Sequence, residues 1–213
     1  MRRSLFAGLA LVVCLVISHQ SVNAQTDEHK AEVGGLYTIV TLTDFQARLF
    51  PATGAGSNTL SGIGGRFGYY VHKNVAIDAE ANFFPEAHLL NEEFGQKMQG
   101  FIGVKAGVRK NKLGIFAKAR PGVMWFGEFP SRGSCSSTTF GSVCGVAHQK
   151  NFALDVGGVF EYYPTDRLIV RFDAGDTIIR YPEVQTRVGT LPVLVPAATK
   201  NNLQISLGVG WRF

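Results

Sequence analysis

The sequence lacks a long apolar run, and this absence excludes membrane-spanning helices. An apolar run of 13 residues occupies positions 5–17, but no stretch of eighteen or more apolar residues occurs anywhere. A helix needs about 20 predominantly apolar residues to cross a bilayer. If the chain crosses a membrane, it does so with another kind of element.

The sequence also has few cysteines and a low net charge. Of three cysteines, Cys14 lies within the first apolar run, which leaves Cys135 and Cys144. Two cysteines suit an oxidising compartment, and we predict that they form a disulfide rather than a metal site, because no paired-histidine spacing accompanies them. The formal net charge is only +5 and is scattered along the chain, so we expect no nucleic-acid partner.

The N-terminus has the three parts of a secretory signal peptide. Arg2 and Arg3 precede the apolar run, and the small-residue site Val22-Asn23-Ala24 follows it. We therefore predict a signal peptide over residues 1–24. Residues 25–213 remain as one domain, with a formal charge of +3.

The clearest pattern is at the C-terminus, over residues 202–213. Every odd position from Leu203 to Phe213 is apolar, and every even position is polar, glycine or charged. A strict period of two predicts a strand with one apolar and one polar face.

Seven earlier segments have a similar pattern and complete a set of eight strands. They cover residues 31–42, 60–71, 75–84, 98–109, 113–126, 152–163 and 168–180. Their lengths are close to the ~9–11 residues that a tilted strand needs to cross a bilayer. The connections alternate between long and short, as expected when short turns face the periplasm and long loops face outward. We predict an all-β, eight-stranded antiparallel up-and-down transmembrane β-barrel.

Glycine on the polar faces favours a membrane barrel over a soluble one such as a lipocalin, which alternates in the same way. Glycine weakens a strand and has no use on a wet exterior, but it suits a narrow lumen where few side chains fit. The glycines in this phase are Gly62, Gly64, Gly68, Gly103, Gly107, Gly114, Gly122, Gly157, Gly175, Gly208 and Gly210.

The same faces carry charges of both signs, which predicts a mutually neutralised lumen. The residues are Arg66, Asp78, Glu80, Lys105, Lys118, Arg120, Asp155, Glu161, Arg171, Asp173 and Arg212. If residues 72–74 form a three-residue turn, Val71 pairs with Val75 and Arg66 faces Glu80. If residues 165–167 turn, Glu161 faces Arg171. Opposed residues lie close enough for ion pairs.

Aromatic residues gather at strand ends on the apolar faces. The last two, at the C-terminus, also resemble part of a known sequence signal. Phe83, Trp125, Tyr162, Trp211 and Phe213 predict two interfacial girdles. The ending Trp211-Arg212-Phe213 resembles the C-terminal assembly signal of bacterial outer-membrane β-barrels. Residues 158–164 with 171–176 resemble the sixth hairpin of the small OmpA/OmpX-type barrels.

The OmpA/OmpX-type resemblance covers nearly all of residues 25–213. It implies a monomer without a cofactor in the bacterial outer membrane, in contact with lipid and lipopolysaccharide and inserted by the barrel assembly machinery. It also implies a structural, adhesive or defence role. No periplasmic peptidoglycan-binding domain follows Phe213, so anchoring by that route is not implied.

Two classes of function stay open. The first is a structural and interaction protein with binding, if any, through loops 43–59, 85–97, 127–150 and 181–201. The second is a small-solute pore or a lipid-modifying enzyme. His88 and His148 lie in or beside those loops, but no spacing ties a serine to a histidine, so we predict no catalytic residue.

Overall fold

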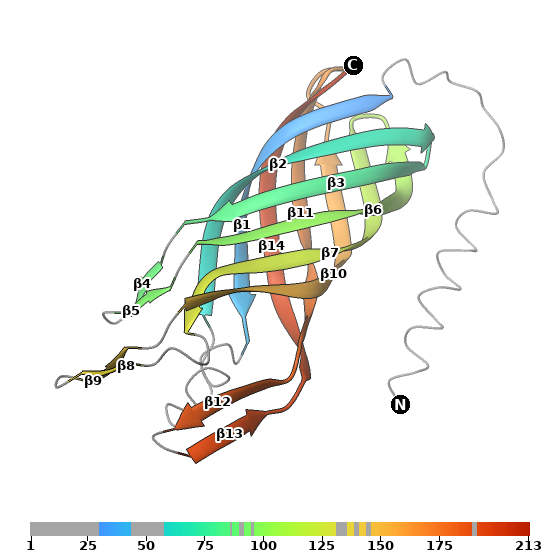
Figure 1. Cartoon of the computed structure of the whole chain (residues 1–213). Helices are drawn as coiled ribbons and strands as arrows, with labels where there is room; N and C mark the ends of the chain where they lie inside the picture. The colour runs from blue at the N-terminus through green and yellow to red at the C-terminus, as the bar shows by residue number, and fades with distance from the viewer. Residues whose placement is uncertain are drawn as a thin grey trace.

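The computed structural model describes residues 30–43, 58–85, 87–89, 92–94, 96–130, 136–138, 141–143, 146–188 and 191–213. These residues form eight long strands and three short hairpins (Figure 1). The long strands are β1 (Ala31–Leu42), β2 (Asn58–His72), β3 (Val75–Phe84), β6 (Lys97–Lys110), β7 (Leu113–Pro130), β10 (Val146–Tyr162), β11 (Leu168–Tyr181) and β14 (Ala198–Arg212).

The long strands close into an antiparallel barrel in the order β1-β14-β11-β10-β7-β6-β3-β2. Neighbours in the chain are neighbours in the ring, and β1 pairs with β14 to close it from Glu32↔Arg212 to Val40↔Gln204. Beyond that ladder, Ala31 and Phe213 exchange two backbone hydrogen bonds of 3.0 and 2.9 Å. Closure leaves no strand edge for lipid to meet, which a bilayer requires. The predicted fold class is confirmed.

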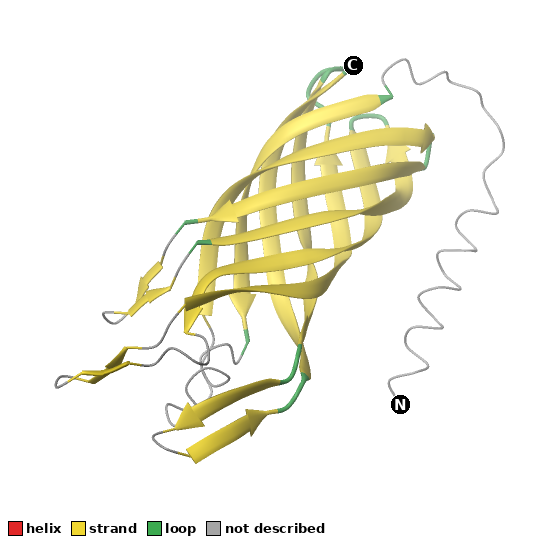
Figure 2. Cartoon of the chain, in the orientation of Figure 1, coloured by secondary structure: helices red, strands yellow, loops and turns green. Residues whose placement is uncertain are grey.

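The three short hairpins all lie at the end of the barrel opposite the C-terminus (Figures 1 and 2). They are β4 (Ala87–Leu89) with β5 (Glu92–Phe94), β8 (Ser136–Thr138) with β9 (Gly141–Val143), and β12 (Val184–Val188) with β13 (Leu191–Val195). We call this the loop end and the opposite one the turn end. The chain leaves the barrel at this same end after β1, β3, β7 and β11, and the last three of these connections each contain a strand pair.

Several long strands extend beyond their predicted bounds toward the loop end. β7 continues to Pro130, where it pairs with Val146 of β10. β14 begins at Ala198, opposite Tyr181 of β11. Sequence alternation marks only the membrane-facing part of a strand, so it could not show this extension. In the described part of the chain, no helix is long and apolar enough to cross a membrane.

The first turn differs from the prediction. His72, rather than Val71, pairs with Val75, and the register shifts between Tyr70 and His72. The turn is therefore two residues long, with an irregularity at Val71 that takes up the extra residue. The bulge compensates for the shorter turn, so the pairs from Tyr70↔Ala76 to Ile63↔Phe83 have the predicted register.

Side chains alternate between the lumen and the outer face along every long strand. β14 shows the cleanest pattern: its even residues from Asn202 to Arg212 are buried, and its odd residues are exposed. Large apolar side chains point outward from all eight strands, for example Ile63, Ile102, Ile115, Phe172 and Leu207. A soluble barrel would have the reverse arrangement, so this outer face requires lipid.

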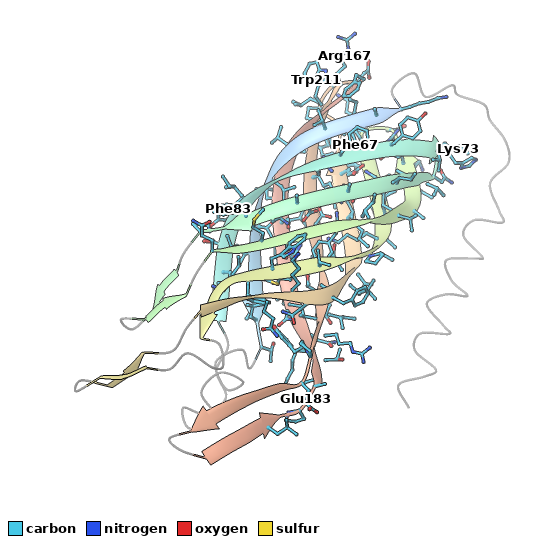
Figure 3. The ribbon with its side chains drawn as sticks, in the orientation of Figure 1. Phe67, Lys73, Phe83, Arg167, Glu183 and Trp211 are labelled. Carbon is cyan, nitrogen blue, oxygen red and sulfur yellow. The ribbon has the colours of Figure 1, made fainter. Side chains whose placement is uncertain are left out.

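The predicted aromatic girdles lie on the outer face at two levels. Trp211 is near the turn end, and Phe83 is where β3 approaches the loop end (Figure 3). Tyr162, Trp211 and Phe213 are exposed, while Phe83 and Trp125 are half-buried.

Candidate functional site

The lumen is filled in layers, and strand β7 shows their order. From the turn end, its inward side chains are Phe116, Lys118, Arg120, Met124 and Phe126, and all five are buried. Charged residues thus lie between apolar ones. The lumen-facing side chains of all eight strands form three zones. The charge layer, near the middle, consists of the buried residues joined by ion pairs: Glu32, Arg66, Asp78, Glu80, Lys105, Lys118, Arg120, Asp155, Glu161, Arg171 and Asp173. An apolar seal lies near the loop end, and the lumen opens at the turn end.

Arg120 holds together one half of the charge layer. Its Nε lies 2.8 Å from Oδ2 of Asp155 on the adjacent strand. Its Nη1 lies 2.7 Å from both Asp78 Oδ2 and Glu80 Oε2 on β3. The guanidinium group is fully buried and bridges three carboxylates on two strands. Charge-assisted bonds of this length are the strong kind.

Arg171 holds together the other half from across the ring. It binds Asp173 on its own strand through Nε and Nη2, at 2.7 and 2.8 Å. It also reaches Asp78 at 3.0 and 2.9 Å, although β11 and β3 lie four places apart in the ring. Lys118 joins the two halves, with Nζ at 3.0 Å from Asp155 and 3.4 Å from Asp173.

Glu32 belongs to the charge layer and was missed by the sequence analysis. Lys105 Nζ lies 2.6 Å from Glu32 Oε1 and 2.6 Å from Glu161 Oε1. The irregular alternation of residues 31–42 hid Glu32, because the inward positions Leu36 and Val40 of that strand are apolar. Counting back from Thr38 in steps of two, along the lumen-facing side of the strand, would have identified Glu32.

Both predicted cross-strand registers are confirmed, but they predict ion pairs incompletely. Arg66 is opposite Glu80, and Glu161 is opposite Arg171. Arg171 Nη1 lies 3.8 Å from Glu161 Oε1. Arg66 instead lies 3.6 Å from Glu32 and 3.8 Å from Glu161, since Arg120 engages Glu80.

A narrow lumen explains this difference, because long side chains reach across it and are not limited to the facing residue. Glycine makes the necessary room for Arg66. A Cβ at Gly34 or Gly210 would lie 3.1 Å from its guanidine nitrogens.

The apolar seal differs from the prediction, which placed glycines and charged side chains in the lumen. It lies on the loop-end side of the charge layer and is made by ten buried residues: Val40, Leu42, Leu60, Phe84, Phe101, Met124, Phe126, Ala153, Ile179 and Tyr181. These residues occupy the same alternate positions as the lumen glycines and charges of their strands. Extending that alternation toward the loop end would have identified them from the sequence.

Amides and hydroxyls form a hydrogen-bonded belt inside the lumen. Gln204 Oε1 accepts from Gln99 Nε2 at 3.1 Å and from the Thr177 hydroxyl at 2.9 Å. Asn82 Nδ2 donates to Glu80 at 2.7 Å, which connects the belt to the charge layer. Buried polar groups are tolerable when they are paired in this way.

At the turn end, cations and aromatic rings alternate. Arg109 lies 4.8 Å from the Tyr70 ring centroid and 4.6 Å from that of Tyr163, and Arg212 lies 5.2 Å from Tyr163. Tyr163 follows β10, in the turn to β11, and its hydroxyl donates to Glu161. Burial first, and the Glu161 carboxylate second, raise the pKa of the Tyr163 phenol above its ordinary value, so this donor stays protonated.

Lumen glycines give a prediction with an internal control. A Cβ at Gly64 would lie 1.9 Å from Asn82 Oδ1 and 2.3 Å from the Ala81 carbonyl oxygen, whereas nothing lies within 4 Å of one at Gly158. We expect Gly64→Ala to lower the free energy of unfolding by about 1–3 kcal/mol through overpacking. Gly158→Ala, on the outer face, should change it by less than about 0.5 kcal/mol. Urea unfolding in lipid vesicles measures both, and equal effects would contradict the tight lumen.

The remaining predicted residues are placed as follows. Cys135 and Cys144 lie outside the described residues, so their disulfide stays a prediction. His88 lies in β4, opposite Glu93 of β5, and His148 lies in β10. Among the described residues, no group of three or more histidine, cysteine or acidic side chains is arranged to hold a metal ion.

Comparison with known proteins agrees with this architecture. The family model described as "Outer membrane protein beta-barrel domain" matches residues 8–213. Comparison with curated protein sequences gave no match.

Among solved structures, Neisserial surface protein A has a TM-score of 0.58 at 11% identity, over 86% of this chain and 97% of that one. The attachment invasion locus protein Ail of Yersinia pestis has a TM-score of 0.49 at 11% identity, over 87% and 99%. The N-terminal β-barrel domain of Pseudomonas aeruginosa OprF has 0.47 at 12% identity, over 87% and 99%. At such identity the likeness concerns the fold alone.

Proposed function

Because the chain belongs to the outer membrane protein β-barrel domain family and lies in the bacterial outer membrane, we propose that it is a sealed barrel that presents binding loops. In this function the lumen does not conduct. Partners at the cell surface bind at the loop end, and the turn end faces the periplasm. The proposed role is structural and interactive rather than catalytic.

The filled lumen is the observation that carries this proposal. A pore needs a continuous aqueous path, as in wide barrels with many strands. Here Arg171 on β11 reaches Asp78 on the opposite side of the ring, and Arg120 on β7 joins Asp155 on β10 to Asp78 on β3. The apolar seal follows in series toward the loop end. The seal supports closure independently, because a change in ion pairing at the charge layer leaves the apolar side chains in place.

The loop end supports the binding part of the proposal. The three hairpins β4–β5, β8–β9 and β12–β13 extend there, and Leu194 of β13 is exposed. Exposed apolar residues beyond the membrane can mark interaction sites. The turn end offers only short connections, which suits the periplasmic side.

Shortening the connections between the long strands, within residues 43–57, 85–96, 131–145 and 182–197, to tight turns tests the binding role, because it leaves all eight long strands intact. We expect cells that display the shortened barrel to lose attachment to surfaces that wild-type cells bind. Outer-membrane levels and gel mobility with and without boiling serve as the control for folding. Unchanged attachment at equal expression would overturn the binding role.

A small-solute pore or a lipid-modifying enzyme is the alternative. Lipid A from cells that express the barrel identifies an enzyme by mass spectrometry if acyl groups are removed or added. The partners implied by the resemblance remain proposals: a monomer, lipopolysaccharide contact, and recognition of Trp211 and Phe213 by the assembly machinery. Both aromatic side chains are exposed, and Trp211 lies near the turn end (Figure 3), which supports the last of these.

A further inference from the structure

We infer that the turn end holds a binding pocket for a small oxyanion, of the phosphate class, at the mouth of the lumen. A cavity of about 250 Å³ opens there between the Asn111–Lys112 turn and the segment after β10. It is smaller than the ~300–1,000 Å³ typical of pockets for drug-sized ligands. Its size therefore suits a compact group such as phosphate.

The charge of the pocket selects the sign of the ligand. Arg109, Lys112 and Arg212 line it, and Asp166 is the single acid among its lining residues. Arg109 and Arg212 come from the lumen side, whereas Lys112 and Asp166 are exposed on the turns. Arginine presents a planar set of donors that matches phosphate oxygens, and lysine adds a mobile positive charge.

The pocket is held in shape before any ligand arrives. The Tyr163 backbone N–H donates to the Lys112 carbonyl at 2.8 Å, so the two turns that form the walls are tied together. Within the second turn, Leu168 N donates to the Thr165 hydroxyl at 3.1 Å. The Arg109 and Arg212 guanidinium groups both lie over the Tyr163 ring, at 4.6 and 5.2 Å from its centroid, which orients both side chains. Pre-organisation of this kind lowers the cost of binding.

The opposite signs of Lys112 and Asp166 allow a test that structural damage cannot imitate. The barrel is purified in an uncharged, phosphate-free detergent and titrated with inorganic phosphate at constant ionic strength, and backbone amide NMR shifts are followed. We expect saturable shifts at Lys112, Thr165 and Asp166. Lys112→Gln should weaken phosphate binding roughly threefold, and Asp166→Asn should strengthen it by a similar factor, as for partly exposed charges.

Lys110→Gln is the matched control, since Lys110 carries the same charge two residues away and does not line the pocket. We expect it to leave the affinity unchanged. Absence of saturable shifts would overturn the inference. Equal weakening in the Lys110 and Lys112 variants would also overturn it, as would weaker binding after Asp166→Asn.

The phosphate group has two possible sources, and a second titration separates them. Glycerophosphoglycerol carries the headgroup phosphate of an anionic phospholipid without its acyl chains. Tighter binding of this diester than of inorganic phosphate identifies a lipid headgroup as the source. Tighter binding of inorganic phosphate identifies a soluble periplasmic anion. Either order supports the pocket, because both require saturable binding that depends on Lys112.

Discussion

Arg120→Met should destabilise the barrel by about 3–5 kcal/mol, because it removes one partner from a buried set of charges. The guanidinium group contacts Asp78, Glu80 and Asp155, and the variant leaves these carboxylates with fewer cations. Asp78 keeps Arg171, and Asp155 keeps Lys118. Glu80 has Arg120 as its ion-pair partner among the described residues, so its carboxylate loses the most.

A second substitution distinguishes lost charge pairing from lost packing. Glu80→Gln in the Arg120→Met background removes the carboxylate that is left uncompensated, so the double variant should be more stable than the single one. Coupling between contacting residues is typically about 0.5–3 kcal/mol. Arg180→Met, at an exposed position of β11, is the control and should cost less than about 0.5 kcal/mol. Additive effects of the Arg120 and Glu80 changes would contradict the network.

Phe101→Ala should have an effect of similar size for a different reason. Phe101 is buried in the apolar seal with Phe84, Met124 and Phe126, and truncation leaves a cavity that lipid cannot reach. Truncation of a core phenylalanine costs about 3–5 kcal/mol, as lost transfer energy plus a cavity term. Urea unfolding in lipid vesicles measures the loss.

Phe172→Ala is the matched control for the seal. Phe172 points outward from β11 and is exposed to lipid. Lipid chains fill the space after truncation, so the cavity term is absent. With a cavity on the order of 80 Å³, that term is about 2 kcal/mol at ~24 cal/mol per Å³. Equal losses for Phe101→Ala and Phe172→Ala would show that the loop-end half of the lumen is not closely packed.

The sequence predicts the barrel well because lipid imposes a strict alternation on the lipid-facing part of each strand. Residues 202–213 show that alternation without exception, and β14 follows it to Arg212. Alternation also fixes register where a turn is short. Arg66 was placed opposite Glu80 even though the turn beside them was predicted one residue too long.

The lumen was harder to predict because alternation assigns a face and not a partner. Arg66 lies near Glu32 and Glu161, and Arg171 reaches Asp78 across the ring. Such contacts depend on lumen width, which the sequence does not show. The apolar seal was missed because its residues resemble the lipid-facing ones in type and differ from them only in phase.

Conductance of the wild-type barrel in a planar lipid bilayer is the most direct test of the sealed lumen. Two barriers in series, the charge layer and the apolar seal, predict no steady open level at either polarity. The Arg120→Met variant should also stay closed, because Phe84, Phe101 and Phe126 still fill the loop-end half. A steady, reproducible single-channel conductance from the correctly folded wild-type barrel would contradict the sealed lumen.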